Sequence, residues 1–195
     1  MPEWTPLVFE LLEAKSRTLF NHCSRVSFYA GLLGKASGLT DDELKTLAFG
    51  SFLHDIGMLA MDSPEAEAAD DAAGQPRRHP ELGARMIGPL QLPAEVRQIV
   101  LYHHERYDGS GTPFGLQGEG IPMLARIVHL AETFDHLVSD APGLPVHDAI
   151  EQVRSLGGSA FDPTLTEVFA KVMRESEGVM PPVAPTFRPA ALPRR

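Results

Sequence analysis

The sequence predicts an all-α protein, on three observations. Apolar residues recur at three- and four-residue steps along most of the chain, which is the spacing that places side chains on one face of a helix. Prolines and glycines stand where these patterned segments begin and end, as they do at helix boundaries. No segment alternates apolar and polar residues strongly enough to indicate a strand. We therefore expect packed helices without a sheet.

Length and composition are those of one globular domain. The chain has 195 residues, of which 43% are apolar and 22% charged, and a chain of this size hides roughly 70% of its unfolded surface on folding. The formal net charge of −9 disfavours a nucleic-acid polymer as a partner, because a phosphate backbone selects clustered lysine and arginine. A small anionic ligand remains compatible with this charge if metal ions supply local positive charge.

The N-terminal residues and the cysteine content indicate a cytoplasmic protein. Glu3, Glu10 and Glu13 make the start of the chain acidic, whereas a signal peptide begins with basic residues. No run approaches the roughly eighteen apolar residues of a membrane span. Cys23 is the single cysteine, which excludes a disulfide within the chain and is best explained as a small buried residue.

The first two expected helices follow a short helical extension over residues 1–14. One carries His22 among its apolar residues and stops near residues 34–38. The other begins at Thr40, which forms a capping-box pattern with Glu43. His22 therefore points toward the core.

The second of these helices leads to two adjacent polar residues. His54 and Asp55 follow its apolar stripe, and Gly57 is expected to end the helix. Residues 62–78 are rich in Ala, Asp, Glu and Pro without an apolar stripe, so we expect a surface loop there. His79 then stands at the entrance of a short helix.

Two more helices frame a glycine-rich loop. Pro93 opens a helix whose apolar stripe runs into His103 and His104, and the loop DGSGTP follows at residues 108–113. Pro122 then begins a long helix.

The long helix and the segments after it complete the domain. Glu132 and Asp135 lie together on one face of the long helix, beside its apolar stripe. Two further helices are expected near residues 146–155 and 163–175, and the proline-rich tail at 179–195 is expected to be flexible.

Histidines and carboxylates thus gather where helices meet the core. One buried histidine is usually a hydrogen-bonded core residue, but burial of this many titratable groups without partners would cost several kcal/mol each. Metal ions account for the whole set. Imidazole nitrogen mixed with carboxylate oxygen suits iron, manganese or zinc, and Asp55 can bridge two ions because a carboxylate has two oxygens.

Four motifs carry a resemblance to a known family. They are HDIG at 54–57, HPELG at 79–83, HHERYDGSGTP at 103–113 and GGSAFDP at 157–163. In this order they closely resemble HD-GYP domains, members of the HD phosphohydrolase superfamily. The resemblance implies an HD-domain-like helical bundle over residues 15–178. It also implies hydrolysis of the bacterial messenger cyclic di-GMP to linear pGpG or GMP.

The resemblance further implies the ligands of two divalent metal ions, with iron or manganese favoured and zinc as an alternative. The matching positions are His22, His54, Asp55, His79, His103, His104 and Glu132. Glu132 stands where the family has an aspartate, so its longer side chain keeps the carboxylate and changes the geometry. Asp135 matches a second acidic position, which we expect to support a ligand. His54 and Asp55 would lie at the catalytic centre, where a water activated by two metals attacks phosphorus without a protein nucleophile.

The glycine-rich loop is expected to border the mouth of this site. Asp108, Gly109 and Gly111 are candidate substrate-binding residues, because glycines let the backbone approach a ligand closely. An ordinary tight loop between helices would explain the glycines equally well. Arg126 is the matching cation left for phosphate binding, since residues 139–144 replace the basic stretch that family members carry after the long helix.

Three positions depart from the family in ways that bear on activity. Met58 replaces the lysine of the common HDIGK pattern, which removes a cationic donor. Thr112 replaces the tyrosine of the GYP signature. Thr18 replaces a glutamate of members with three metals, which favours two metals here.

Three hypotheses about function follow. The favoured one is an active cyclic di-GMP phosphodiesterase. The second is a degenerate module that binds metal, nucleotide or a protein partner without efficient turnover, and the third is a phosphohydrolase of another nucleotide or phosphate ester. Because the sequence contains no recognisable sensory domain, regulation is expected through oligomerisation or through a separate protein, such as a diguanylate cyclase or a response regulator. His129, His136 and His147 lie outside the motifs and are expected to be structural or solvent-facing.

Overall fold

The computed structural model describes residues 4–61 and 77–176, and the all-α prediction is confirmed there, since no strand forms within these two ranges. The α-helices are α1 (Thr5–Lys15), α2 (Arg17–Ala36), α3 (Asp41–Leu53), α5 (His79–Met86), α6 (Ala94–Tyr102), α7 (Met123–Ser139), α8 (Val146–Ser155) and α9 (Pro163–Glu175). Two short 3₁₀ helices are η1 (Ile56–Ala60) and η2 (Gly118–Gly120). The loop predicted at 62–78, apart from its last two residues, and the tail predicted at 179–195 lie outside the described residues. None of the described helices has the length and apolar content to cross a membrane.

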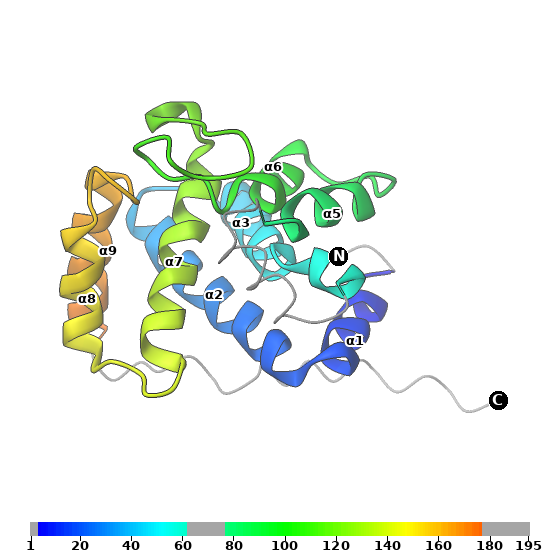
Figure 1. Cartoon of the computed structure of the whole chain (residues 1–195), viewed down its shortest axis with the longest axis horizontal. Coiled ribbons are helices and arrows are strands. Elements are labelled where there is room, and N and C mark those ends of the chain that lie inside the picture. Colours follow the sequence, from blue (N-terminus) through cyan, green and yellow to red (C-terminus); the bar gives the residue numbers. More distant parts are fainter. Residues whose placement is uncertain (1–3, 62–76, 177–195) are drawn as a thin grey trace.

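Helix α2 lies at the centre of the arrangement. It packs against α3 and α7, and also against α1 and α9. Figure 1 shows α8 and α9 side by side at one end of the molecule, beyond α7, with α1, α5 and α6 toward the other end. The segments that carry the predicted ligands therefore lie on α2 and the elements around it.

Two apolar clusters form the core. The larger is built from α2, α3, α6, α7, α8 and α9, and in it the rings of Phe134 and Phe169 meet edge to face with centroids 5.0 Å apart. The second lies between α1, α2, α3, η1, α5 and α6, and it contains the buried thiol of Cys23, as predicted. His22 on α2 directly precedes Cys23 of the second cluster and lies one helical turn before Val26 of the first.

Local sequence signals account for several helix boundaries. Thr40 caps α3, because its hydroxyl oxygen accepts the backbone N–H of Glu43 at 3.3 Å and the Glu43 carboxylate accepts the backbone N–H of Thr40 at 2.8 Å. Helices α8 and α9 have the predicted bounds, 146–155 and 163–175. These boundaries follow from nearby residues alone.

Helix α3 ends earlier than predicted, for a tertiary reason. Its last residue is Leu53 rather than Gly57, and η1 follows at Ile56. Gly57 is pressed against the start of α5, so that a Cβ at this position would lie 2.0 Å from the carbonyl oxygen of His79. This close backbone contact joins two of the sequence motifs and sets Asp55 beside His79.

Gly57→Ala is expected to lower the free energy of unfolding by about 1–3 kcal/mol or more, because the added methyl group must displace backbone rather than a flexible side chain. Gly31→Ala is the matched control. No atom lies within 4 Å of a Cβ at Gly31 in the middle of α2, so this change should raise the free energy of unfolding by about 0.5–1 kcal/mol. Chemical denaturation measures both, and equal effects of the two substitutions would contradict the close contact.

Candidate metal centre

The carboxylate of Asp55 lies between two groups of imidazoles. Its Oδ1 is 3.1 Å from Nε2 of His79 and 3.7 Å from Nε2 of His103. Its Oδ2 faces the other group, at 3.5 Å from Nε2 of His54 and 3.8 Å from Nε2 of His22. Each oxygen of the Asp55 carboxylate thus faces a different group of imidazoles.

The first group has the spacing of ligands around one ion. The Nε2 atom of His79 lies 3.0 Å from Nε2 of His103 and 3.1 Å from Nε2 of His104. Ligands at right angles with bonds of about 2.1 Å lie about 3.0 Å apart. Asp55, His79, His103 and His104 therefore form a set with the dimensions of a metal site.

The second group lies between α2, α7 and the end of α3. His22, His54 and Asp55 have ligating atoms within 4.8 Å of one another. Glu132 adds a second buried carboxylate on α7, and its Oε1 is 3.8 Å from Nε2 of His104. Glu132 therefore stands between the two groups.

Backbone carbonyls orient two of the rings. The Nδ1–H of His54 donates to the carbonyl oxygen of Ser51 at 2.7 Å, and that of His103 donates to the carbonyl oxygen of Val100 at 2.9 Å. With Nδ1 protonated, Nε2 carries the lone pair and points at Asp55. This support behind the ring is typical of metal-binding histidines.

A carboxylate orients the third ring. The Nδ1–H of His22 donates to Oδ2 of Asp135 at 2.8 Å, and Arg25 holds both oxygens of Asp135 at 2.6 and 2.9 Å. Asp135 therefore supports a predicted ligand from behind, in the place that the sequence predicted for it.

Burial and neighbouring charges keep Asp55 and His54 in the protonation states that bind metal. Burial acts to raise the pKa of the Asp55 carboxyl, but the surrounding imidazoles, His54 and His79 foremost, outweigh it and hold this pKa well below its ordinary value. Burial lowers the pKa of His54 to about 4. At neutral pH Asp55 is charged and His54 neutral, and these are the forms that ligate metal.

Several buried atoms in the cluster need a partner. Within the described residues, Nε2 of His22, Nε2 of His54 and Oε2 of Glu132 are buried without a hydrogen bond. An unpaired buried polar atom is costly. A divalent cation would satisfy these atoms, so the donor set fits bound metal.

The structure brings together all the residues predicted as ligands. They come from α2 (His22), the turn after α3 (His54, Asp55), the first residue of α5 (His79), the end of α6 (His103, His104) and α7 (Glu132). Their role as ligands stays a prediction.

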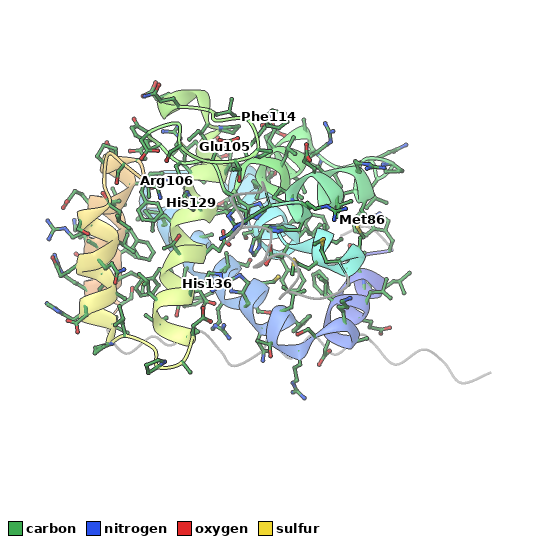
Figure 2. All side chains as sticks on the ribbon, viewed as in Figure 1. Met86, Glu105, Arg106, Phe114, His129 and His136 are labelled. Carbon is green, nitrogen blue, oxygen red and sulfur yellow. The ribbon has the colours of Figure 1, made fainter. Side chains whose placement is uncertain are left out.

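The loop after α6 is held by a buried residue that the sequence reasoning missed. Glu105, 1% exposed, accepts the backbone N–H groups of Phe114 at 2.7 Å and Leu116 at 3.0 Å. Figure 2 labels Glu105, Arg106 and Phe114, which belong to this loop, in the upper part of the view. Backbone bonds from Tyr107 and Asp108 to residues 159–160 tie the loop to the GGSAFDP motif.

The predicted substrate-binding residues of the loop make local contacts. Asp108 accepts the backbone N–H and the hydroxyl of Ser110 at 2.9 and 2.6 Å, and these bonds lower its pKa to about 2. Gly109 has φ of +82°, and a Cβ at Gly111 would lie 2.1 Å from the backbone nitrogen of Arg106. The loop shape itself thus requires these glycines, and substrate contact by them remains a prediction.

The expected role of Arg126 in binding substrate stays a prediction. Its guanidinium forms an ion pair with Asp162, and the same aspartate caps α9 through the backbone N–H of Thr164 at 2.8 Å. Arg126 therefore fixes the junction of α7 and α9. Arg77, just before α5, instead reaches the cluster, with Nη1 3.1 Å from Nε2 of His104.

His136 also lies at the cluster, although it was expected to be structural or solvent-facing. Its Nε2 is 3.8 Å from Oε1 of Glu132, and its ring centroid is 4.7 Å from that of His22. The neighbouring Glu132 carboxylate raises the pKa of His136 to about 9. The sequence signal that could have placed His136 at the cluster is its spacing of four residues from Glu132 on one helix. The ring centroid of His129 lies 5.0 Å from that of Phe161. Figure 2 shows His129 and His136 on α7.

The fold and the cluster define a class of protein, the helical domains with a histidine and carboxylate metal centre. The family model described as HD domain matches residues 6–165. The chain therefore belongs to the HD domain family, as the sequence motifs predicted. The match begins within α1, which packs on α2 through the second apolar cluster.

The chain is similar to curated bacterial phosphodiesterases. It is 32% identical over 164 residues to the cyclic di-GMP phosphodiesterase response regulator RpfG of Xanthomonas campestris, covering 80% of this chain and 43% of that protein. It is 30% identical over 194 residues to the cyclic di-GMP phosphodiesterase of Thermotoga maritima, covering 89% and 51%. A 3'3'-cGAMP-specific phosphodiesterase 2 of Vibrio cholerae is 31% identical, with 83% and 33% covered. The chain thus spans about half or less of the length of these relatives.

Solved structures share the fold. An HDG"Y"P protein from Bdellovibrio bacteriovorus matches with a TM-score of 0.64 at 23% identity, covering 80% of this chain and 52% of that one. The phosphodiesterase PgpH HD domain of L. monocytogenes, in complex with cyclic di-AMP, matches with a TM-score of 0.65 at 15% identity, covering 88% and 95%. Both likenesses establish the HD-domain-like helical bundle.

Proposed function

We propose that this chain is a metal-dependent phosphodiesterase that hydrolyses cyclic di-GMP to linear pGpG or GMP. The observation that carries the proposal is the position of Asp55, whose two oxygens face two separate groups of histidines. A shared carboxylate between two ligand sets is suited to a pair of ions. The similarity to named cyclic di-GMP phosphodiesterases supports the substrate class.

The proposed centre holds two divalent metal ions. Its imidazole and carboxylate donors suit iron, manganese or zinc, and the resemblance to HD-GYP domains favours iron or manganese. One ion would be held by Asp55, His79, His103 and His104, and the other by His22, His54, Asp55 and Glu132. Two such ions, when bound, supply an activated water and offset the charge of the phosphoryl oxygens. His54 and Asp55, packed at the end of α3, fix the position of that chemistry.

Among the described residues, Arg77 is a cation that lies beside the proposed centre. Arg77 reaches the ring of His104, and a guanidinium can donate two parallel hydrogen bonds to a phosphate. We therefore keep Arg126 as the proposed phosphate contact and add Arg77 as a second candidate. Asp108, Gly109 and Gly111 remain candidates at the rim.

A specific observation favours a second candidate, a module that binds nucleotide without efficient turnover. Met58, on η1 three residues after Asp55, has no cationic donor, and Arg126 is occupied by Asp162. A third candidate keeps the chemistry and changes the nucleotide, which the similarity to a 3'3'-cGAMP-specific phosphodiesterase supports.

Turnover by metal-reconstituted protein separates these candidates. The protein is loaded anaerobically with iron or manganese and incubated with cyclic di-GMP, 3'3'-cGAMP and cyclic di-AMP, and products are separated by chromatography. We expect cleavage of cyclic di-GMP in preference to the other two. Tight nucleotide binding by fully loaded protein without product would replace the enzyme by the binding module, and preferred cleavage of 3'3'-cGAMP would change the substrate.

A regulatory partner and a location follow from the proposed substrate. Cyclic di-GMP is an internal messenger, so the proposal places the protein in the cytoplasm. One relative is named a response regulator, which supports a protein partner, such as a response regulator or a diguanylate cyclase, as the source of the signal.

A further inference from the structure

A histidine outside the sequence motifs faces the second group of ligands. His136 lies one helical turn after Glu132 on α7, and its side chain is 49% exposed. The ligating atoms of His22, Glu132 and His136 all lie within 4.8 Å of one another. This spacing is within the reach of one metal ion.

The ring of His136 is oriented in the same way as that of His22. Its Nδ1 lies 2.9 Å from Oδ2 of Asp140, while its Nε2 points toward Glu132. In His22 the corresponding carboxylate is Asp135. A carboxylate behind the ring fixes the tautomer and raises the basicity of the other nitrogen, as in metal-binding histidines.

We propose that His136 is a further metal ligand, which binds the same ion as His22 and Glu132. The inference rests on the proposed metal centre. The Nδ1–H of His22 is taken by Asp135, so His22 has one nitrogen left and can serve one ion only. His136 therefore adds a ligand to an existing ion and does not create a third site.

A competing arrangement needs no metal at His136. A protonated imidazole between Glu132 and Asp140 would form an ion pair with each carboxylate. In that case His136 would balance charge, and its removal would weaken the binding of neither ion. Metal binding distinguishes the two arrangements, whereas turnover alone does not.

The experiment compares metal binding by the wild type, His136→Gln, Asp140→Asn and His147→Gln. Titration with Mn²⁺ by calorimetry, with elemental analysis of the loaded proteins, gives the number of ions and each affinity. We expect two ions in the wild type. His136→Gln should keep one affinity and lower the other roughly tenfold or more, and Asp140→Asn should weaken the same ion by about tenfold or more through the orientation of the ring.

His147→Gln is the matched control. This histidine also lies beside an aspartate, with Nδ1 3.3 Å from Oδ1 of Asp148, but its side chain is 73% exposed and it belongs to none of the candidate ligand groups of the described chain. Its replacement should change neither affinity. Circular dichroism checks that each variant keeps its helices.

The outcomes separate the inference from the proposal on which it rests. Two ions with unchanged affinities in both His136→Gln and Asp140→Asn would overturn the role of His136 and leave the binuclear centre standing. A wild type that binds no ion after anaerobic loading would overturn the centre and the inference together. The absorption spectrum of Co²⁺-loaded protein is a second readout, because loss of a nitrogen ligand should alter it in His136→Gln and not in His147→Gln.

Discussion

Asp55→Ala is expected to remove most of the bound metal and to lower turnover of cyclic di-GMP by roughly a thousandfold or more. The two oxygens of Asp55 face the two groups of histidines, so the substitution takes one ligand from each proposed ion. It also leaves imidazole nitrogens in a buried space without the negative charge that balances a cation. Elemental analysis of protein purified without chelator, followed by steady-state kinetics, measures both effects.

The control for this substitution is Asp148→Ala. Asp148 lies in the first turn of α8 with its side chain 62% exposed, so its removal should change neither metal content nor rate. Two ions per chain in Asp55→Ala would refute the proposal that this carboxylate is shared between two ions.

Met58→Lys is expected to raise kcat about a hundredfold at unchanged metal content. Met58 lies on η1, and its backbone N–H donates to the carbonyl oxygen of Asp55 at 2.9 Å. A lysine there would put an ammonium group close to the proposed centre. Its hydrogen bond to a phosphoryl oxygen would strengthen as charge grows in the transition state, so kcat should change more than KM.

Met86→Lys is the matched control, because Met86 is an exposed methionine at the last residue of α5. This substitution adds the same charge at the C-terminal end of α5, whereas His79 lies at the N-terminal end. An equal gain from Met86→Lys would mean that net charge attracts the anionic substrate, and no gain from Met58→Lys would show that this position does not limit the rate.

Regular patterns and motifs predicted most of the helices and the composition of the cluster. The apolar spacing gave the bounds of α8 and α9, because those helices are amphipathic and end at local signals. The motif histidines could be grouped because each follows or begins a helix whose apolar face is buried. The sequence analysis predicted no distances. The two oxygens of Asp55 face two different groups of histidines because of the way α2, η1, α5 and α6 pack together.

The features that the sequence did not reveal have a common physical cause, which is contact between residues far apart in sequence. The ion pair of Arg126 with Asp162 joins residues 36 positions apart. The end of α3 depends on the backbone of His79, to which Gly57 is close. The approach of His136 to His22 could not be predicted, because it depends on the packing of α7 against α2.

Glu105 gives the loop after α6 an anchor of its own. One buried carboxylate holds the backbone of residues 114 and 116, and the backbone N–H of Thr112 donates to the carbonyl oxygen of His104 at 3.2 Å. These bonds involve main-chain atoms of the loop, so the identity of an outward side chain such as Phe114, 57% exposed, hardly affects them. If the loop borders the proposed site, variation of its outward side chains can change the rim while these main-chain bonds keep the loop in place next to His103 and His104. With the side chains of the rim separate from the proposed metal ligands, related chains can come to differ in substrate while they keep the same reaction centre.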